Sequence, residues 1–182
     1  MHADVRTLPE ILADYRPRTV EEEADLRRAV ELAGSGDPWS RSTALHVTVS
    51  ALVVHPPTRR VLLRWHARQQ AWLQIGGHAD PGETHPLGVV LREGREETGL
   101  TDLACWPDAA VRHVVVVPVA PAKGEPAHEH VDVRFVLATD TPDDIRPEKP
   151  GAVLEWLTIA EASARTSEAN LREFLTRVEE LF

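Results

Sequence analysis

Residues 76–100 read GGHADPGETHPLGVVLREGREETGL, and this stretch decides how the fold of the whole chain is interpreted. Residues 86–98 have the pattern of a helix, because Pro86 suits a first helical position and Gly99 suits the residue that ends a helix. Two glycines that close a short apolar run stand before it. The stretch therefore predicts a strand that ends in Gly-Gly, then a loop, then a helix.

The expected helix carries a group of carboxylates. Glu93 and Glu97 are four residues apart and share one helical face, and Glu96 flanks the same side. Three crowded carboxylates repel one another unless cations neutralise them, and hard divalent ions such as Mg²⁺ or Mn²⁺ do so and also bridge to phosphate. The alternative is an exposed acidic face with ordinary surface pairing. The strand end before it favours the metal site, because its backbone carbonyls are free to act as oxygen ligands.

This stretch resembles the Nudix box of the MutT-like hydrolases, whose pattern is G-x5-E-x7-R-E-U-x-E-E-x-G-U with U aliphatic. The residues at its fixed positions are Gly77, Glu83, Arg92, Glu93, Glu96, Glu97, Gly99 and Leu100. The box thus spans residues 77–100, with one extra residue between Glu83 and Arg92 and with Gly94 at an aliphatic position. The spacing Arg-Glu-x-x-Glu-Glu is intact, so we interpret the extra residue as a longer loop ahead of the helix.

The resemblance implies a metal-dependent hydrolase in which water attacks a diphosphate linkage of a nucleoside diphosphate derivative. By position, it implies metal ligands for Mg²⁺ or Mn²⁺ in the Gly76 carbonyl, Glu93 and Glu97. Glu96 would be a further ligand or the partner that holds Arg92. Arg92 would orient these glutamates, and Glu93 would also act as the base that deprotonates the water, although the family varies in which glutamate does so. Arg92, Glu93, Glu96 and Glu97 are the expected catalytic residues.

A second polar segment, residues 127–135 with the sequence AHEHVDVRF, reads as a strand. One face of this strand carries His128, His130, Asp132 and Arg134, and Glu129 lies on the other face. Such a row suits the wall of a site, and Glu129 or Asp132 could supply an additional acidic metal ligand. The main alternative is an exposed edge strand whose polar residues face water.

Contacts to substrate have only weak candidates in the sequence. His78 lies in the box loop, where a phosphate could reach it, and His128, His130 and Arg134 come from the polar strand. A histidine-rich zinc site is disfavoured because no compact set of ligands accompanies this spacing.

The rest of the chain alternates between the two regular patterns. Helical segments are expected at residues 8–15, 20–33 and 170–181, and strands at residues 44–54, 61–65, 72–75, 111–119, 130–138 and 153–157. Together they predict an α/β (α+β) fold, namely a Nudix-type α/β/α sandwich with a mixed sheet between helices. We expect an N-terminal helical extension over residues 1–42 and a Nudix hydrolase domain over residues 43–182.

The composition of the chain limits the kinds of molecule that it is expected to bind. The chain has 182 residues, a formal charge of -9 and one cysteine. The negative charge gives no general attraction to nucleic acid or anionic lipid, and the longest apolar run is too short to span a membrane. We therefore expect a small-molecule substrate and, because no signal-peptide run is present, a cytoplasmic location. A homodimer is possible by analogy with the family.

Two other functions fit the same resemblance. Isopentenyl diphosphate isomerase shares the fold, but its catalytic cysteine would stand at Gly76, which disfavours this activity. A catalytically weak or inactive Nudix domain could instead serve as a nucleotide-binding regulatory module, although an intact set of clustered glutamates argues against it. The sequence leaves open the substrate, the general base and the role of the N-terminal helices.

Overall fold

The computed structural model describes residues 6–122 and 124–182, so residues 1–5 of the expected extension lie outside it. Its helices are α1 (Leu8–Asp14), α2 (Val20–Ala33), α3 (Pro86–Thr98), α4 (Ile159–Arg165) and α5 (Ala169–Glu179), with 3-10 turns at Pro56–Thr58 and Pro142–Asp144. Its strands are β1 (Leu45–His55), β2 (Arg60–His66), β3 (Ala71–Leu73), β4 (Ile75–Gly77), β5 (Ala104–Cys105), β6 (His113–Val119), β7 (His128–Ala138) and β8 (Leu154–Thr158). Sequence patterns missed α4 and β5, and they merged β3 and β4, which part at Gln74.

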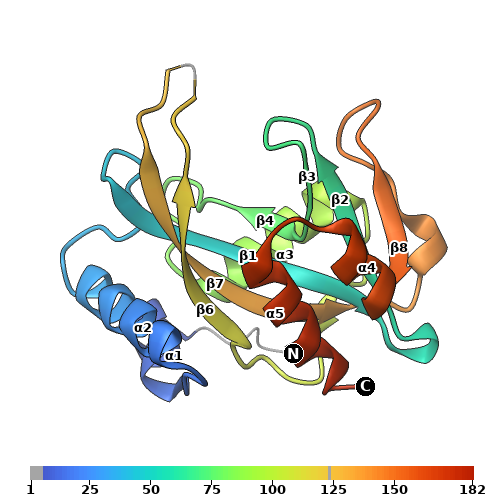
Figure 1. The fold of residues 1–182 in the computed structure, drawn as a ribbon, viewed down its shortest axis with the longest axis horizontal. Coiled ribbons are helices and arrows are strands. Elements are labelled where there is room, and N and C mark those ends of the chain that lie inside the picture. Colours follow the sequence, from blue (N-terminus) through green and yellow to red (C-terminus); the bar gives the residue numbers. More distant parts are fainter. Residues whose placement is uncertain (1–5, 123) are drawn as a thin grey trace.

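One mixed sheet organises the fold. Its central pair, β1 and β7, runs parallel from Leu45 opposite Glu129 to Val54 opposite Ala138. The strand order is β3-β2-β1-β7-β5, and β4, β6 and β8 pair antiparallel with β1, β7 and β2 respectively. Figure 1 shows the two long central strands crossing the molecule. The expected mixed sheet is confirmed.

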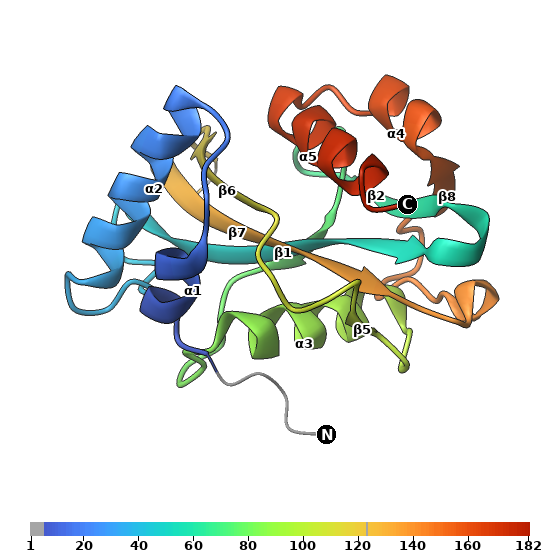
Figure 2. The same ribbon diagram turned by 90° about the horizontal axis from the view of Figure 1, so that it is seen from below.

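Alternate side chains of β1 face two different layers. Val47, Val49 and Ala51 lie in a buried cluster with residues of α3, whereas Leu52 and Val54 lie in a second cluster with residues of α4 and α5. Viewed from below, the sheet separates α3 from the α4–α5 pair (Figure 2). This arrangement is the expected α/β/α sandwich.

The N-terminal helices pack on the same cluster as α3. The Tyr15 hydroxyl accepts hydrogen bonds from the Val114 backbone N–H at 3.2 Å and from Arg177 of α5 at 3.1 Å. Glu22 of α2 accepts from Arg177 Nη1 at 2.7 Å, and both side chains are 4% exposed. The helices are therefore fixed to the sandwich through buried polar contacts. In the described part of the chain, no helix has the length and apolar character needed to cross a membrane.

Candidate active site

Helix α3 begins and ends where the sequence predicts. His85 is the N-cap residue, Pro86 follows it, and Gly99 closes the helix with φ +71° and donates its N–H to the Arg95 carbonyl at 2.8 Å. Gly94 is buried, and a Cβ at this position would lie 2.8 Å from Leu103 Cδ1. Close packing against Leu103 explains why glycine replaces the aliphatic residue of the box.

The two glycines at the end of β4 let this strand fit between β1 and α3. Gly76 has φ +141°, and a Cβ there would lie 2.4 Å from the Val49 carbonyl oxygen. A Cβ on Gly77 would lie 2.8 Å from Glu93 Oε1. Gly76 has to be glycine because a Cβ there would meet backbone atoms, and at Gly77 the missing side chain leaves room for the Glu93 carboxylate.

Arg92 connects the box loop to the carboxylates. Its Nε and Nη2 donate to the Glu83 carboxylate at 3.0 and 2.8 Å, and Nη2 also donates to the His78 carbonyl at 3.0 Å. Its Nη1 donates to Glu93 Oε1 at 2.9 Å and to Glu96 Oε2 at 3.0 Å. These bonds to Arg92 hold the pKa of Glu83 below its usual value. The structure thus places Arg92 as the residue that orients two glutamates of the helix.

The three glutamates have different environments. Glu97 is 8% exposed, accepts from the Gly76 N–H at 3.0 Å and pairs with Arg64 Nη1 at 2.8 Å. Burial raises the pKa of Glu97 to about 7 and also raises the pKa of Glu93, which is 15% exposed. Glu96 is 52% exposed and lies on Arg92. Glu93 and Glu97 line a cleft of about 410 Å³, and Glu96 is not among its lining residues.

The donor set of this cleft suits a hard cation. Glu93 and Glu97 offer carboxylate oxygens, and burial raises the pKa of each although Arg92 and Arg64 lie against them. Oxygen ligands of this kind are those that Mg²⁺ and Mn²⁺ prefer. Glu96 is held away from the cleft by Arg92, so its role as a ligand stays a prediction.

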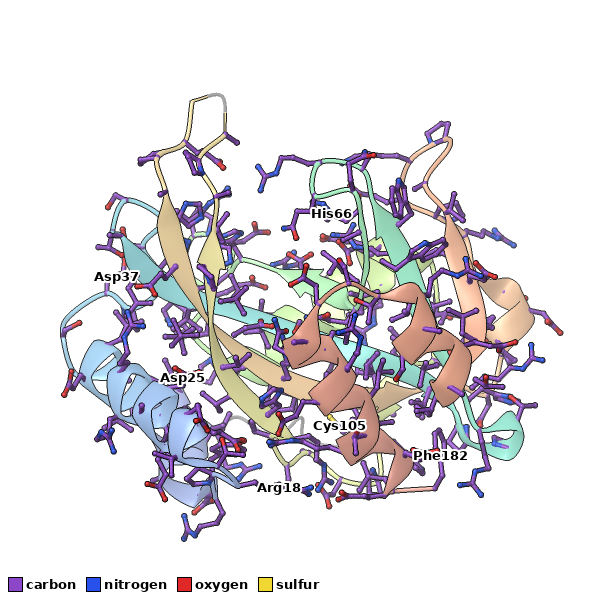
Figure 3. The ribbon with its side chains drawn as sticks, viewed as in Figure 1. Arg18, Asp25, Asp37, His66, Cys105 and Phe182 are labelled. Carbon is purple, nitrogen blue, oxygen red and sulfur yellow. The ribbon has the colours of Figure 1, made fainter. Side chains whose placement is uncertain are left out.

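The polar segment of β7 forms another wall of the cleft. β7 lies between β1 and β6, so the alternative of an exposed edge strand is wrong. Asp132 accepts hydrogen bonds from Ser50 Oγ at 2.8 Å and from Arg134 Nε at 2.8 Å, and Arg134 is 2% exposed. His66, which is labelled in Figure 3, also lines this cleft. The buried ion pair between Asp132 and Arg134 therefore forms part of this wall.

Glu129 does not face this cleft. It lies on the opposite face of β7 and pairs with Arg28 of α2 at 2.5 Å. Of the two candidates for an additional acidic ligand, only Asp132 lines the cleft. Glu129 instead attaches α2 to the sheet.

Four histidines gather where β1, β4 and β7 meet. His78 and His130 line the cleft, and His128 Nε2 lies 3.1 Å from His130 Nε2. Burial lowers the pKa of His78 to about 3 and that of His130 to about 4, so both rings are neutral at pH 7. His46 of β1 joins them, with its Nε2 3.1 Å from His78 Nε2. Sequence reasoning missed His46, and only the parallel register of β1 with β7 could have placed it.

Two further cleft residues were missed. Arg64 of β2 reaches Glu97, as described above, and Gln74 lies between β3 and β4. Gln74 Nε2 donates to Ser50 Oγ at 3.2 Å, whereas its Oε1 is buried without a hydrogen-bond partner among the described residues. Neither residue belongs to a local sequence motif, because the side chains that each one contacts come from distant parts of the chain.

Fold and site together define a Nudix-type hydrolase, with an Arg-Glu-x-x-Glu-Glu helix set against a Gly-Gly strand end between two helical layers. The sequence model of the NUDIX domain matches residues 44–178. This match covers well over half of the chain, so the chain belongs to the Nudix family and is a Nudix hydrolase.

Relatives of known name agree with this assignment. The Probable DHNTP pyrophosphohydrolase of Lactococcus lactis subsp. cremoris (strain MG1363) is 27% identical over 140 residues, which cover 75% of this chain and 82% of that protein. A C. elegans Ap4A hydrolase, solved as a binary complex, has a TM-score of 0.58 at 19% identity and covers 73% of this chain and 94% of its own. The E. coli dihydroneopterin triphosphate pyrophosphohydrolase has a TM-score of 0.54 at 20% identity, with 74% and 94% covered. The two solved structures bear on the fold alone.

Proposed function

We propose that this Nudix hydrolase cleaves the pyrophosphate linkage of a nucleoside diphosphate derivative and depends on Mg²⁺ or Mn²⁺. The observation that carries the proposal is the pair Glu93 and Glu97, two desolvated carboxylates that face one cleft beside the Gly76 backbone. The Gly76 carbonyl, Glu93 and Glu97 would hold the ion, with Glu96 as a further candidate. The bound cation would neutralise charge on the non-bridging phosphate oxygens and acidify the attacking water.

Three residues of α3 would carry out the other steps, which are proton transfer and the positioning of the site. Glu93 is fixed by Arg92 at 2.9 Å and would accept the proton of the attacking water. Arg92 also binds Glu83 and the His78 carbonyl, so it keeps the box loop in register with the helix. Glu97 binds the Gly76 N–H and thereby sets the position of the β4 backbone.

A named relative indicates which compound to test first. The Lactococcus protein is named as a probable DHNTP pyrophosphohydrolase and is 27% identical over 140 residues. Dihydroneopterin triphosphate therefore comes first among the compounds to test, before nucleoside triphosphates, nucleotide sugars and coenzyme derivatives.

The test is release of phosphate, pyrophosphate or nucleotide from this panel, with and without Mg²⁺ or Mn²⁺. We expect metal-dependent turnover of one class of compound, which Glu97→Gln abolishes and the exposed matched control Glu179→Gln retains. Folded wild-type protein that binds a nucleotide but turns over no compound would contradict the proposal and favour the regulatory module.

The expected setting of the enzyme follows from its charge. We propose a cytoplasmic hydrolase of small molecules without general affinity for nucleic acid, because the net charge of -9 repels polyanions that are not bound through a metal. A homodimer stays an expectation from the family.

A further inference from the structure

Three histidines from separate segments converge on one point of the cleft. His46 of β1 stands directly opposite His130 of β7 in the parallel register. His78 follows Gly77, the last residue of β4, and Gly77 pairs with Val49 of β1. Strand pairing therefore fixes His46 and His130, and His78 is placed by its position directly after the last paired residue of β4.

The ring nitrogens lie close enough together for one metal ion to bind all three. One ligand nitrogen from each of the three rings lies within 4.8 Å of the other two, and His46 Nε2 is 3.1 Å from His78 Nε2. Around a tetrahedral zinc ion, with Zn–N bonds of about 2.0–2.1 Å, ligand nitrogens stand about 3.3 Å apart. Among the described residues, this is the one set of three histidine, cysteine or acidic side chains that comes so close.

The other nitrogen of His46 has the partner that a metal ligand needs. His46 Nδ1 lies 3.0 Å from the Thr43 carbonyl oxygen. A carbonyl can only accept, so Nδ1 carries the proton and Nε2 presents its lone pair toward His78. Metal-binding histidines are usually oriented in this way, by a backbone carbonyl or carboxylate on the nitrogen that does not bind the ion.

We propose that His46, His78 and His130 form a binding site for a divalent transition-metal ion such as Zn²⁺. Imidazole nitrogens suit zinc, iron, nickel and copper, whereas Mg²⁺ and Mn²⁺ suit the oxygens of Glu93 and Glu97. The fourth position is left for water or an oxygen of a ligand in the cleft, because His128 is outside the set and both His78 and His130 line the cleft.

One positive charge lies near the three rings. Burial is the main reason why the pKa of each of these histidines is lowered, and Arg41, which also lines the cleft, adds to this effect. Its side chain is 63% exposed and pairs with Glu125 at 3.9 Å. The guanidinium is therefore free to remain in solvent while a cation occupies the histidines.

The site is tested on the full chain, freed of metal by a chelator and held in millimolar Mg²⁺ to occupy the carboxylates. Zn²⁺ affinity is measured by competition with a chromophoric chelator, and Co²⁺ provides a spectroscopic signature. We expect one tightly bound Zn²⁺ per chain and the visible absorption bands of a four-coordinate Co²⁺ ion.

Variants separate this site from the proposed hydrolytic site. His78→Gln and His130→Gln should each lower Zn²⁺ affinity by at least about tenfold, while His55→Gln, at the far end of β1, should leave it unchanged. The double variant Glu93→Gln/Glu97→Gln should keep the Zn²⁺, so failure of the proposed hydrolysis would not remove this site. Folded wild-type protein that binds no stoichiometric Zn²⁺, or binding lost in the glutamate variant and kept in the histidine variants, would overturn the proposal.

Discussion

The carboxylate end and the histidine end of the cleft are built in opposite ways. Glu93 and Glu97 come from one helix, whereas the three histidines come from β1, from β7 and from the loop that follows β4. Burial acts on both ends, and it raises the pKa of the acids while it lowers the pKa of His78 and His130. One desolvated cleft therefore drives both sets of groups toward neutrality, and each end is left suited to a different kind of cation.

The largest expected effect concerns the carboxylate end. Glu97→Gln should lower kcat by at least about 10²–10⁴-fold, since it removes a buried carboxylate that is proposed to hold the cation. Glu96→Gln should lower kcat by much less, because Glu96 is 52% exposed and lies on Arg92. Steady-state kinetics on the identified substrate measure both variants. Equal losses of kcat in the two variants would show that the exposure of a glutamate does not predict its importance for catalysis.

The next largest expected effect is on stability and concerns the ion pair of Asp132 and Arg134 in the wall of the cleft. Asp132→Asn leaves the buried Arg134 charge without its counter-charge and should lower the free energy of unfolding by about 3–5 kcal/mol. Glu155→Gln is the matched control, because it breaks a half-exposed pair with Arg165 and should cost less than about 1 kcal/mol. Chemical denaturation measures both. Similar costs for the two variants would contradict a buried, structural role for Asp132.

The pH dependence of the free energy of unfolding tests the raised pKa of the buried Glu97. In metal-free protein the pKa of Glu97 is raised from 4.5 to about 7, so the folded state holds this proton more tightly than the unfolded state. The stability from this group is present below pH 4.5 and is lost as the pH rises to about 7. Relative to Glu97→Gln, wild type should lose roughly 3 kcal/mol across this window, at 1.36 kcal/mol per pKa unit.

Denaturant titrations at several pH values measure this difference. Added Mg²⁺ should reduce it, because a bound cation favours the ionised carboxylate. A difference between wild type and Glu97→Gln that does not change with pH would contradict the assignment of a raised pKa to Glu97.

The smallest effects concern the helix that carries the carboxylates. Gly88→Ala should raise the free energy of unfolding by up to about 1 kcal/mol, since a Cβ there meets nothing within 4 Å and alanine favours the helix. Gly94→Ala should lower it by about 1 kcal/mol, because the crowding against Leu103 exceeds that gain. Thermal or chemical denaturation of the two variants checks the opposite signs. A stabilising Gly94→Ala would show that Leu103 moves aside without cost.

Local signals made the carboxylate end predictable. The bounds of α3 follow from Pro86 and Gly99, and the resemblance to the Nudix box pointed to Arg92, which contacts Glu93 and Glu96 in the structure. The histidine end was not predictable, because His46 and His78 lie far from residues 127–135 and meet them only through strand pairing. For the same reason the sequence did not show that Arg64 pairs with Glu97 or that β7 is an interior strand.

Two short elements, α4 and β5, were not predicted from the sequence for a different reason. α4 has only seven residues, too few for a helical period to stand out, although Thr158 and Glu161 form a capping box that marks its start. β5 has two residues and no pattern of its own. Both elements are defined by packing on the sheet, which the sequence does not display.

The buried pair of Glu22 and Arg177 also bears on how the chain folds during synthesis. These residues are 155 positions apart, and Tyr15 is 162 positions from the same arginine. Helices α1 and α2 are synthesised long before α5, so the buried Glu22 obtains its counter-charge from Arg177 only once α5 has been made. We therefore expect the N-terminal helices to complete their packing only after α5 docks.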